Sequence, residues 1–123
     1  MAKTLKRDDK TAFASASAIR TSPRKANLVL GLIRGCHVAD ALDRLTTCRK
    51  RIANEIAKVL ESAISNAENN HNLDVDSLFV SEAIVGTAFT MKRFRARARG
   101  RGMSVIKPYS NVRIQLTERK EAV

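Results

Sequence analysis

The chain has 123 residues, of which 44% are hydrophobic and only 4% aromatic, and its formal net charge at pH 7 is +11. This length suits one domain with one aliphatic core, and no apolar run approaches the roughly 20 residues of a membrane span. The first residues lack a hydrophobic signal region, so we expect a cytosolic protein.

The N-terminal third of the chain predicts a tail, a strand and a helix. Residues 1–10 are charged and unpatterned, which is typical of a flexible tail. Alanine occupies every second position over 12–18, which favours a short strand over 11–19 with one face of small residues. The next helix is predicted to begin with Ser22 as its cap and Pro23 in its first turn. Its predicted apolar stripe consists of Leu28, Val29, Leu32 and Ile33.

Two more helices are predicted before the apolar residues change from helical to strand spacing. Residues 40–45 indicate a short helix, and Thr46 or Thr47 could cap a long one that ends near a turn at 69–72. Apolar residues recur at intervals of three and four along the long helix, which predicts the main core helix. Those residues are Ile52, Ile56, Val59, Leu60, Ala63, Ile64 and Ala67.

The C-terminal half predicts a β-hairpin. Alternating apolar residues near 78–85 and over 112–116 favour two paired strands. If Val80 lies near Leu116, the hairpin turns around residue 98, close to Gly100, which can supply unusual backbone angles. Two strands without a core are marginally stable in water, so we expect the outer part of the hairpin to be mobile alone and ordered by a partner.

The stretch 91–107 carries seven cations and no acid. From Arg93 to Arg101 the arginines occupy every second position, and an extended backbone would place them on one face as a ribbon suited to nucleic-acid phosphates. A solvated basic loop is the alternative. A lipid surface fits less well, because only Phe94 and Met103 offer large apolar side chains. The cations are Lys92, Arg93, Arg95, Arg97, Arg99, Arg101 and Lys107.

A second set of cations precedes or begins the predicted helices. Residues 20–51 carry a net charge of +6, whereas 52–90 carry −5. A helix start disfavours cations unless an anion binds there, so these groups indicate phosphate contacts. Solvated side chains that reach outward remain the alternative. The residues concerned are Arg20, Arg24, Lys25, Arg49, Lys50 and Arg51.

Nothing in the sequence indicates an enzyme, a cofactor or a metal site. The zinc-type ligands Cys36, His37, Cys48 and His71 lack the usual spacing of paired ligands. A free-standing DNA-binding module or RNA chaperone is the second hypothesis. A helix-turn-helix over 40–70 would place Glu55, Glu61 and Glu68 where a groove reader needs cations. We therefore expect an RNA-binding protein without a small-molecule substrate.

Several motifs stand in a characteristic order along the chain. They include Ser22-Pro23-Arg24-Lys25, Leu32-Ile33-Arg34-Gly35, Asn66-Ala67-Glu68-Asn69-Asn70 and Arg97-Ala98-Arg99-Gly100-Arg101. Their order and spacing over roughly residues 14–117 resemble the bacterial large-subunit ribosomal protein L twenty-two family. The resemblance implies an α+β fold, with three helices packed on a small antiparallel three-stranded sheet and a long protruding β-hairpin.

The resemblance also implies a domain organisation and a function. One RNA-binding domain is expected over 11–117, with the hairpin at 86–110 and a C-terminal tail at 118–123. The implied function is that of a structural constituent of the large subunit of the cytoplasmic ribosome. It would bind large-subunit ribosomal RNA and aid assembly beside neighbouring ribosomal proteins, without inserting into a membrane.

By the same resemblance, the hairpin is expected to line the peptide exit tunnel and to meet the nascent polypeptide. The tunnel-lining residues would be Arg93, Arg97, Arg99 and Arg101, with Lys92 near the ribosomal RNA. Two positions depart from the family pattern. Ala96 stands where many members have proline, which leaves the conformation of the tip open. Asn111 stands where many have histidine, which leaves open the role of that position at the base of the hairpin.

Overall fold

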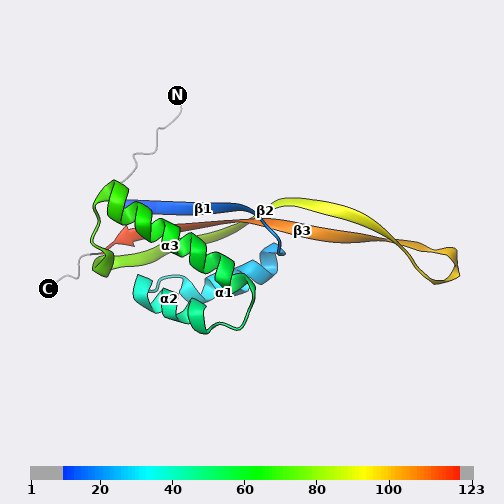
Figure 1. Cartoon of the computed structure of the whole chain (residues 1–123), viewed down its shortest axis with the longest axis horizontal. Helices are drawn as coiled ribbons and strands as arrows, with labels where there is room; N and C mark the ends of the chain where they lie inside the picture. The colour runs from blue at the N-terminus through cyan, green and yellow to red at the C-terminus, as the bar shows by residue number, and fades with distance from the viewer. Residues whose placement is uncertain (1–9, 120–123) are drawn as a thin grey trace, which may run out of the picture.

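The computed structural model describes residues 10–119, in which three helices pack along one side of a three-stranded antiparallel sheet (Figure 1). The sheet has the strand order β1-β3-β2, and two of its strands continue outward as a long hairpin (Figure 1). This arrangement confirms the expected α+β fold. The predicted terminal tails lie almost entirely outside the described residues. The elements are β1 (Thr11–Ile19), α1 (Pro23–Ile33), α2 (Val38–Thr47), α3 (Ile52–His71), β2 (Leu78–Ala96) and β3 (Gly102–Glu118).

Strand β1 forms because its small residues allow α3 to pack closely against the sheet. Ala12 and Ala14 are buried, while Phe13 on the opposite face is 46% exposed. The ladder with β3 shifts register between Ala16 and Ile19, and Ala18 has a positive φ of 57° there. The amide of Ala18 donates to Oδ1 of Asn111 at 3.1 Å. Asn111 therefore satisfies a backbone donor that the irregular ladder leaves without a strand partner.

Helix α1 begins as predicted, but its buried face agrees only in part with the predicted one. The Oγ of Ser22 accepts from the amide of Lys25 at 3.4 Å, which confirms the predicted cap. The predicted stripe was wrong in part, because Leu28 and Leu32 are 63% and 42% exposed. The core face follows the helical spacing of three and four residues from the N-terminal turn onward. Its members are Ala26, Val29, Leu30 and Ile33.

The connection between α2 and α3 also differs from the prediction. Thr46 and Thr47 do not cap α3, because both lie in the last turn of α2 and their hydroxyls donate to the carbonyls of Leu42 and Asp43. Such back-bonding by threonine keeps the hydroxyl within its own helix. Helix α3 follows Arg51, whose side chain makes no capping hydrogen bond. The core stripe of α3 is confirmed, except that Ile64 is only half-buried.

Strands β2 and β3 form the predicted hairpin. Val80 pairs with Leu116, and the chain reverses through a short turn at Ala98–Gly100. Arg99 and Gly100 have positive φ values of 60° and 68°, and the amide of Arg101 donates to the carbonyl of Ala98 at 3.4 Å. These features are typical of the tight turn that joins two twisted strands.

The predicted single face of five arginines is wrong, because the turn interrupts it. Only Arg93 and Arg95 lie within β2, and Ala96 pairs with Gly102 at the end of the ladder. Arg97 and Arg101 flank the turn, and its left-handed residues do not keep the alternation of a strand. The tip therefore forms without the proline common at position 96.

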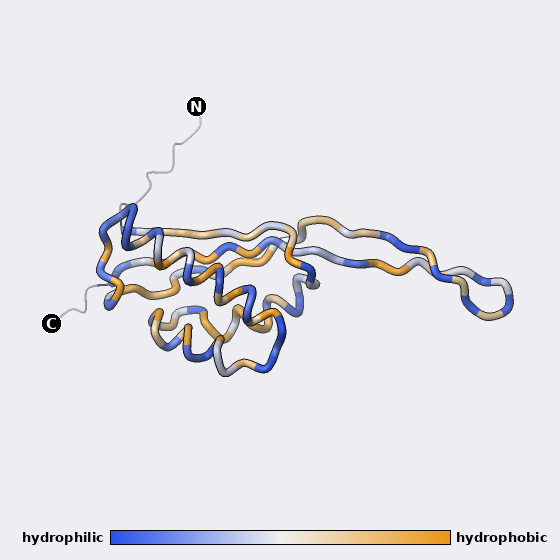
Figure 2. Tube along the Cα trace, in the orientation of Figure 1, coloured by the Kyte–Doolittle hydropathy of each residue, from blue (hydrophilic) through white to orange (hydrophobic). Residues whose placement is uncertain are grey.

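The core lies wholly in the part of the molecule that the helices cover. Residues 86–109, which we call the arm, contain no fully buried side chain. Figure 2 shows hydrophilic residues recurring along the arm and around its tip. Within residues 10–119, no helix has the length and hydropathy needed to span a membrane. The fold thus separates a packed domain from an extension that adds surface but no core.

Candidate nucleic-acid interface

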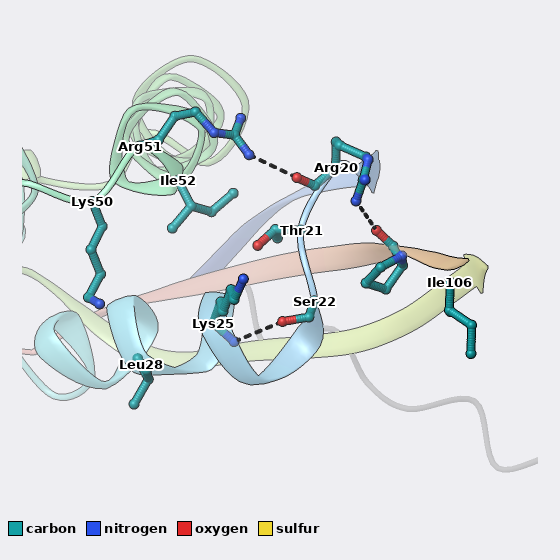
Figure 3. Close-up of a pocket in the computed structure, with 10 residues that line it drawn as sticks. Arg20, Thr21, Ser22, Lys25, Leu28, Lys50, Arg51, Ile52 and Ile106 are labelled. Atoms are coloured by element: carbon teal, nitrogen blue, oxygen red, sulfur yellow. Dashed lines mark hydrogen bonds between the residues drawn. The ribbon is translucent and has the colours of Figure 1, made fainter. Parts of the chain in front are cut away.

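The two basic helix starts come together in one groove where the arm leaves the domain (Figure 3). The groove has a volume of about 850 Å³. Its walls come from the β1–α1 connection, the starts of α1 and α3, and β3 at the base of the arm. We call it the junction groove. Its cationic residues are Arg20, Lys25, Lys50 and Arg51, and no acid among residues 10–119 lines it.

A series of hydrogen bonds fixes the walls of the junction groove relative to one another. Arg51 donates from Nη2 to the carbonyl of Arg20 at 2.9 Å, and Arg20 donates from Nη1 to the carbonyl of Pro108 at 3.3 Å (Figure 3). The buried Ser110 donates from Oγ to the carbonyl of Thr21 at 2.6 Å. Since the acceptors of both arginines are neutral carbonyls, these bonds orient the guanidiniums without neutralising their charge. The groove remains a site of positive potential.

Aromatic rings stiffen the base of the arm beside this groove. Phe89 of β2 and Tyr109 of β3 face each other across the ladder, with centroids 4.6 Å apart and ring planes 18° apart. The guanidinium of Arg20 lies 5.5 Å from the centroid of Tyr109. These contacts join the start of the arm to the β1–α1 connection. The direction in which the arm leaves the domain is therefore held by side chains as well as by the strand ladder.

Cations lie on both faces of the arm and around its tip. Paired residues of antiparallel strands share a face. Arg93, Arg95 and Lys107 therefore lie on one face together with Met91 and Met103, whereas Lys92 shares the other face with Ile106 and Phe94. All seven cations of the stretch are exposed. An arm of this kind can contact phosphates on more than one side at once, which a single-faced ribbon cannot.

Phe94 supports the outer end of the arm. A Cβ atom at position 102 would collide with the ring of Phe94, so the ring lies directly against the backbone of Gly102. Aromatic residues that cover a glycine across a strand pair stabilise the local ladder. Phe94 nevertheless stays 78% exposed. Its free face is available for stacking with a base.

The structure brings together only part of the predicted set of RNA-binding residues. Arg24 and Arg49 are exposed but do not line the junction groove. Conversely, sequence reasoning missed Ile106 and Pro108, which line the groove from β3. The pairing of Val80 with Leu116 gives a register that places Pro108 near the base of the arm. No sequence signal showed that the starts of α1 and α3 would meet it there.

The four residues whose types could bind zinc, Cys36, His37, Cys48 and His71, do not form a metal site in the described part of the chain. His37 accepts at Nδ1 from the amide of Ala39, and its Nε2 lies at hydrogen-bonding distance from the carbonyl of Asp76. Cys36 and Cys48 are free thiols. Among residues 10–119, no three His, Cys, Asp or Glu side chains gather as they would around a metal ion. Both ring nitrogens of His37 thus serve the fold.

These features define a class of small basic structural proteins that combine a compact α+β domain with a cationic extension. Residues 14–117 match the family model described as "Ribosomal protein L22p/L17e". The chain therefore belongs to this ribosomal protein family, which is the one that its motifs resemble. It is a structural protein of the large ribosomal subunit and not an enzyme, and the predicted location in the ribosome is confirmed.

Curated relatives match over nearly the whole chain. The large ribosomal subunit protein uL22 of Maricaulis maris is 59% identical over 114 residues, covering 93% of this chain and 90% of the relative. The protein of the same name from Zymomonas mobilis is 53% identical over 114 residues, with the same coverage of 93% and 90%. That of Rhodospirillum centenum is 57% identical over 110 residues, covering 89% of this chain and 83% of the relative.

Proposed function

We propose that the chain binds large-subunit ribosomal RNA at two connected surfaces, the junction groove and the arm. The observation that carries this proposal is the convergence of Arg20, Lys25, Lys50 and Arg51 at the place where the basic arm begins. Phosphate contacts supply most of the affinity of such surfaces. Arg24 and Arg49 are proposed as peripheral contacts beside the groove.

The arm would act as a spacer between RNA segments. Its cations project from both faces and from the tip, so they can neutralise phosphates of strands that otherwise repel one another. We further propose that Arg93, Arg97, Arg99 and Arg101 line the peptide exit tunnel and meet the nascent polypeptide. This placement is supported by family membership and by the position of the last three of these arginines at the tip.

The organisation of the chain supports a role in subunit assembly. We propose a single domain over 11–117, in which the core folds independently and the hairpin at 86–110 is ordered by RNA. Binding of one protein to several RNA segments would hold them in their final arrangement. Neighbouring ribosomal proteins would then meet a preformed RNA surface.

A charge-matched pair of double variants tests the role of the junction groove. We expect Lys25→Gln with Lys50→Gln to reduce the slope of log K against log salt by about 1.5 for a large-subunit ribosomal RNA transcript, because two phosphate contacts are lost. The control, Lys58→Gln with Arg113→Gln, removes the same charge outside the groove. Filter binding at several salt concentrations gives the slopes. Equal slopes for the two double variants would show that the groove lysines make no more phosphate contacts than cations elsewhere on the surface.

A further inference from the structure

The junction groove is lined by apolar side chains as well as by cations. Leu28 of α1 and Ile106 of β3 are 63% and 59% exposed, and Ile52 and Pro108 complete the apolar lining. Phosphate contacts alone do not account for such a surface, because a phosphate gains nothing from aliphatic neighbours. The ligand of this groove should therefore carry an apolar face next to an anionic group.

We propose that the junction groove holds an unpaired nucleotide of the bound RNA. The phosphates on either side of it would lie against Lys25, Lys50 and Arg51. The flat face of the base would pack on Ile106 and Pro108, and Leu28, at the other end of the groove in Figure 3, would lie against the neighbouring nucleotide. The inference rests on the proposed RNA-binding function and specifies which part of an RNA this groove takes.

Double-stranded RNA cannot supply the same combination of groups. In an A-form helix the bases are stacked inside, and the deep major groove is too narrow for side chains to enter. A nucleotide in a bulge or loop exposes its base within reach of its own phosphate. The groove volume of about 850 Å³ also lies in the range of roughly 300–1,000 Å³ that is usual for pockets that enclose small ligands.

Charge and position favour RNA over an acidic protein segment as the occupant. In the described part of the chain, four cations and no acid line the groove, and the arm that starts there carries seven more cations in the stretch 91–107. A single RNA strand can follow both surfaces, because its charge repeats with every nucleotide. An acidic peptide would have to match both the groove and the arm. The two occupants are distinguished by the experiment below.

The experiment compares two RNAs of equal phosphate count with the full-length protein, at one fixed salt concentration. One RNA is a fully paired duplex, and the other carries a bulge of three unpaired nucleotides. We expect the protein to bind the bulged RNA about tenfold more tightly, since burying one face of a base against apolar side chains contributes a factor of this order. Ile106→Ser should remove most of this preference, and Leu28→Ser, at the other end of the groove, should remove a smaller part of it. The matched control Ile84→Ser changes an isoleucine of β2 that is 51% exposed and lies outside the groove, and it should keep the preference.

Each contrary result has a distinct meaning. Equal, salt-dependent affinity for both RNAs would overturn the unpaired-nucleotide site and leave the proposed RNA binding intact. A preference that survives in Ile106→Ser would place the bulge elsewhere and overturn the inference as well. If an oligoglutamate peptide, but neither RNA, shifts the methyl NMR signals of Leu28 and Ile106, the occupant is an acidic protein segment. That result would contradict both the inference and the proposed role of the groove.

Discussion

Replacing Lys92–Ile106 by Asn-Gly should leave the domain folded and remove a large part of the salt dependence of its binding to ribosomal RNA. The change keeps the pair formed by Met91 and Lys107 and closes it with a two-residue turn. Six of the seven cations of the stretch 91–107 are lost. The slope of log K against log salt should fall by up to about 4–5 if all six contact phosphates. Binding measured over a range of salt concentrations gives this slope.

A second variant separates the charge of the arm from its shape. Changing Arg93, Arg95, Arg97, Arg99 and Arg101 to glutamine keeps the length of the hairpin but removes five charges. It should reproduce most of the change in slope. Thermal unfolding of both variants should stay cooperative, because no side chain in residues 86–109 is fully buried. Loss of cooperative unfolding in the shortened chain would mean that the arm contributes to the core.

Ile114→Ala should destabilise the domain by about 2–5 kcal/mol. Ile114 lies on β3, the central strand, and is fully buried opposite Ala14 of β1 and Ala83 of β2. Its alanine neighbours have no long side chains that could move into the space left by the isoleucine. A chain of this size should then show a fall in Tm of roughly 8 °C or more.

The matched control for this prediction is Ile84→Ala. Ile84 lies on β2 next to the same strand, but its side chain points to the open face of the sheet and is 51% exposed. Its loss should cost less than about 1 kcal/mol. Chemical denaturation of both variants gives the two free energies of unfolding. Similar values for the two variants would contradict the placement of the core between the helices and one face of the sheet.

Much of the fold could be predicted because its local signals agree with its packing. The serine and proline before α1, the helical spacing along α3 and the alternation in β1 and β3 each point to the element that forms. The hairpin register followed from matching Val80 with Leu116. These signals depend on residues close together in sequence, or on the pairing of two regular strands.

The wrong predictions concern segments whose sequence is compatible with two local structures. On α1, Leu28 and Leu32 form as regular a stripe as Ala26 and Leu30, and only packing against the sheet decides which face is buried. The hydroxyl of Thr47 could cap the next helix or donate to a carbonyl of its own helix. Because α2 extends to Thr47, the hydroxyl donates to the carbonyl of Asp43. The alternating arginines indicate a strand, but the turn around Arg99 imposes its own backbone angles.

The candidate site was predictable in its residue types but not in its geometry. Runs of cations without acids mark Lys25, Lys50 and the arm as partner-facing residues. Their convergence depends on contacts between distant parts of the chain, such as that of Arg20 with Pro108, 88 positions apart. The apolar lining by Leu28 and Ile106 has no sequence signal, because an exposed aliphatic residue looks the same as a buried one in a pattern.

Sedimentation of a cell lysate in high salt tests the central claim most directly. The junction groove and the arm together would hold the protein at several RNA segments of the large subunit, so it should stay with large subunits when loosely bound proteins dissociate. The chain with Asn-Gly in place of Lys92–Ile106 should be released at a lower salt concentration. Release of the full-length protein to the top of the gradient, with comparable binding to generic RNA and DNA, would contradict the account.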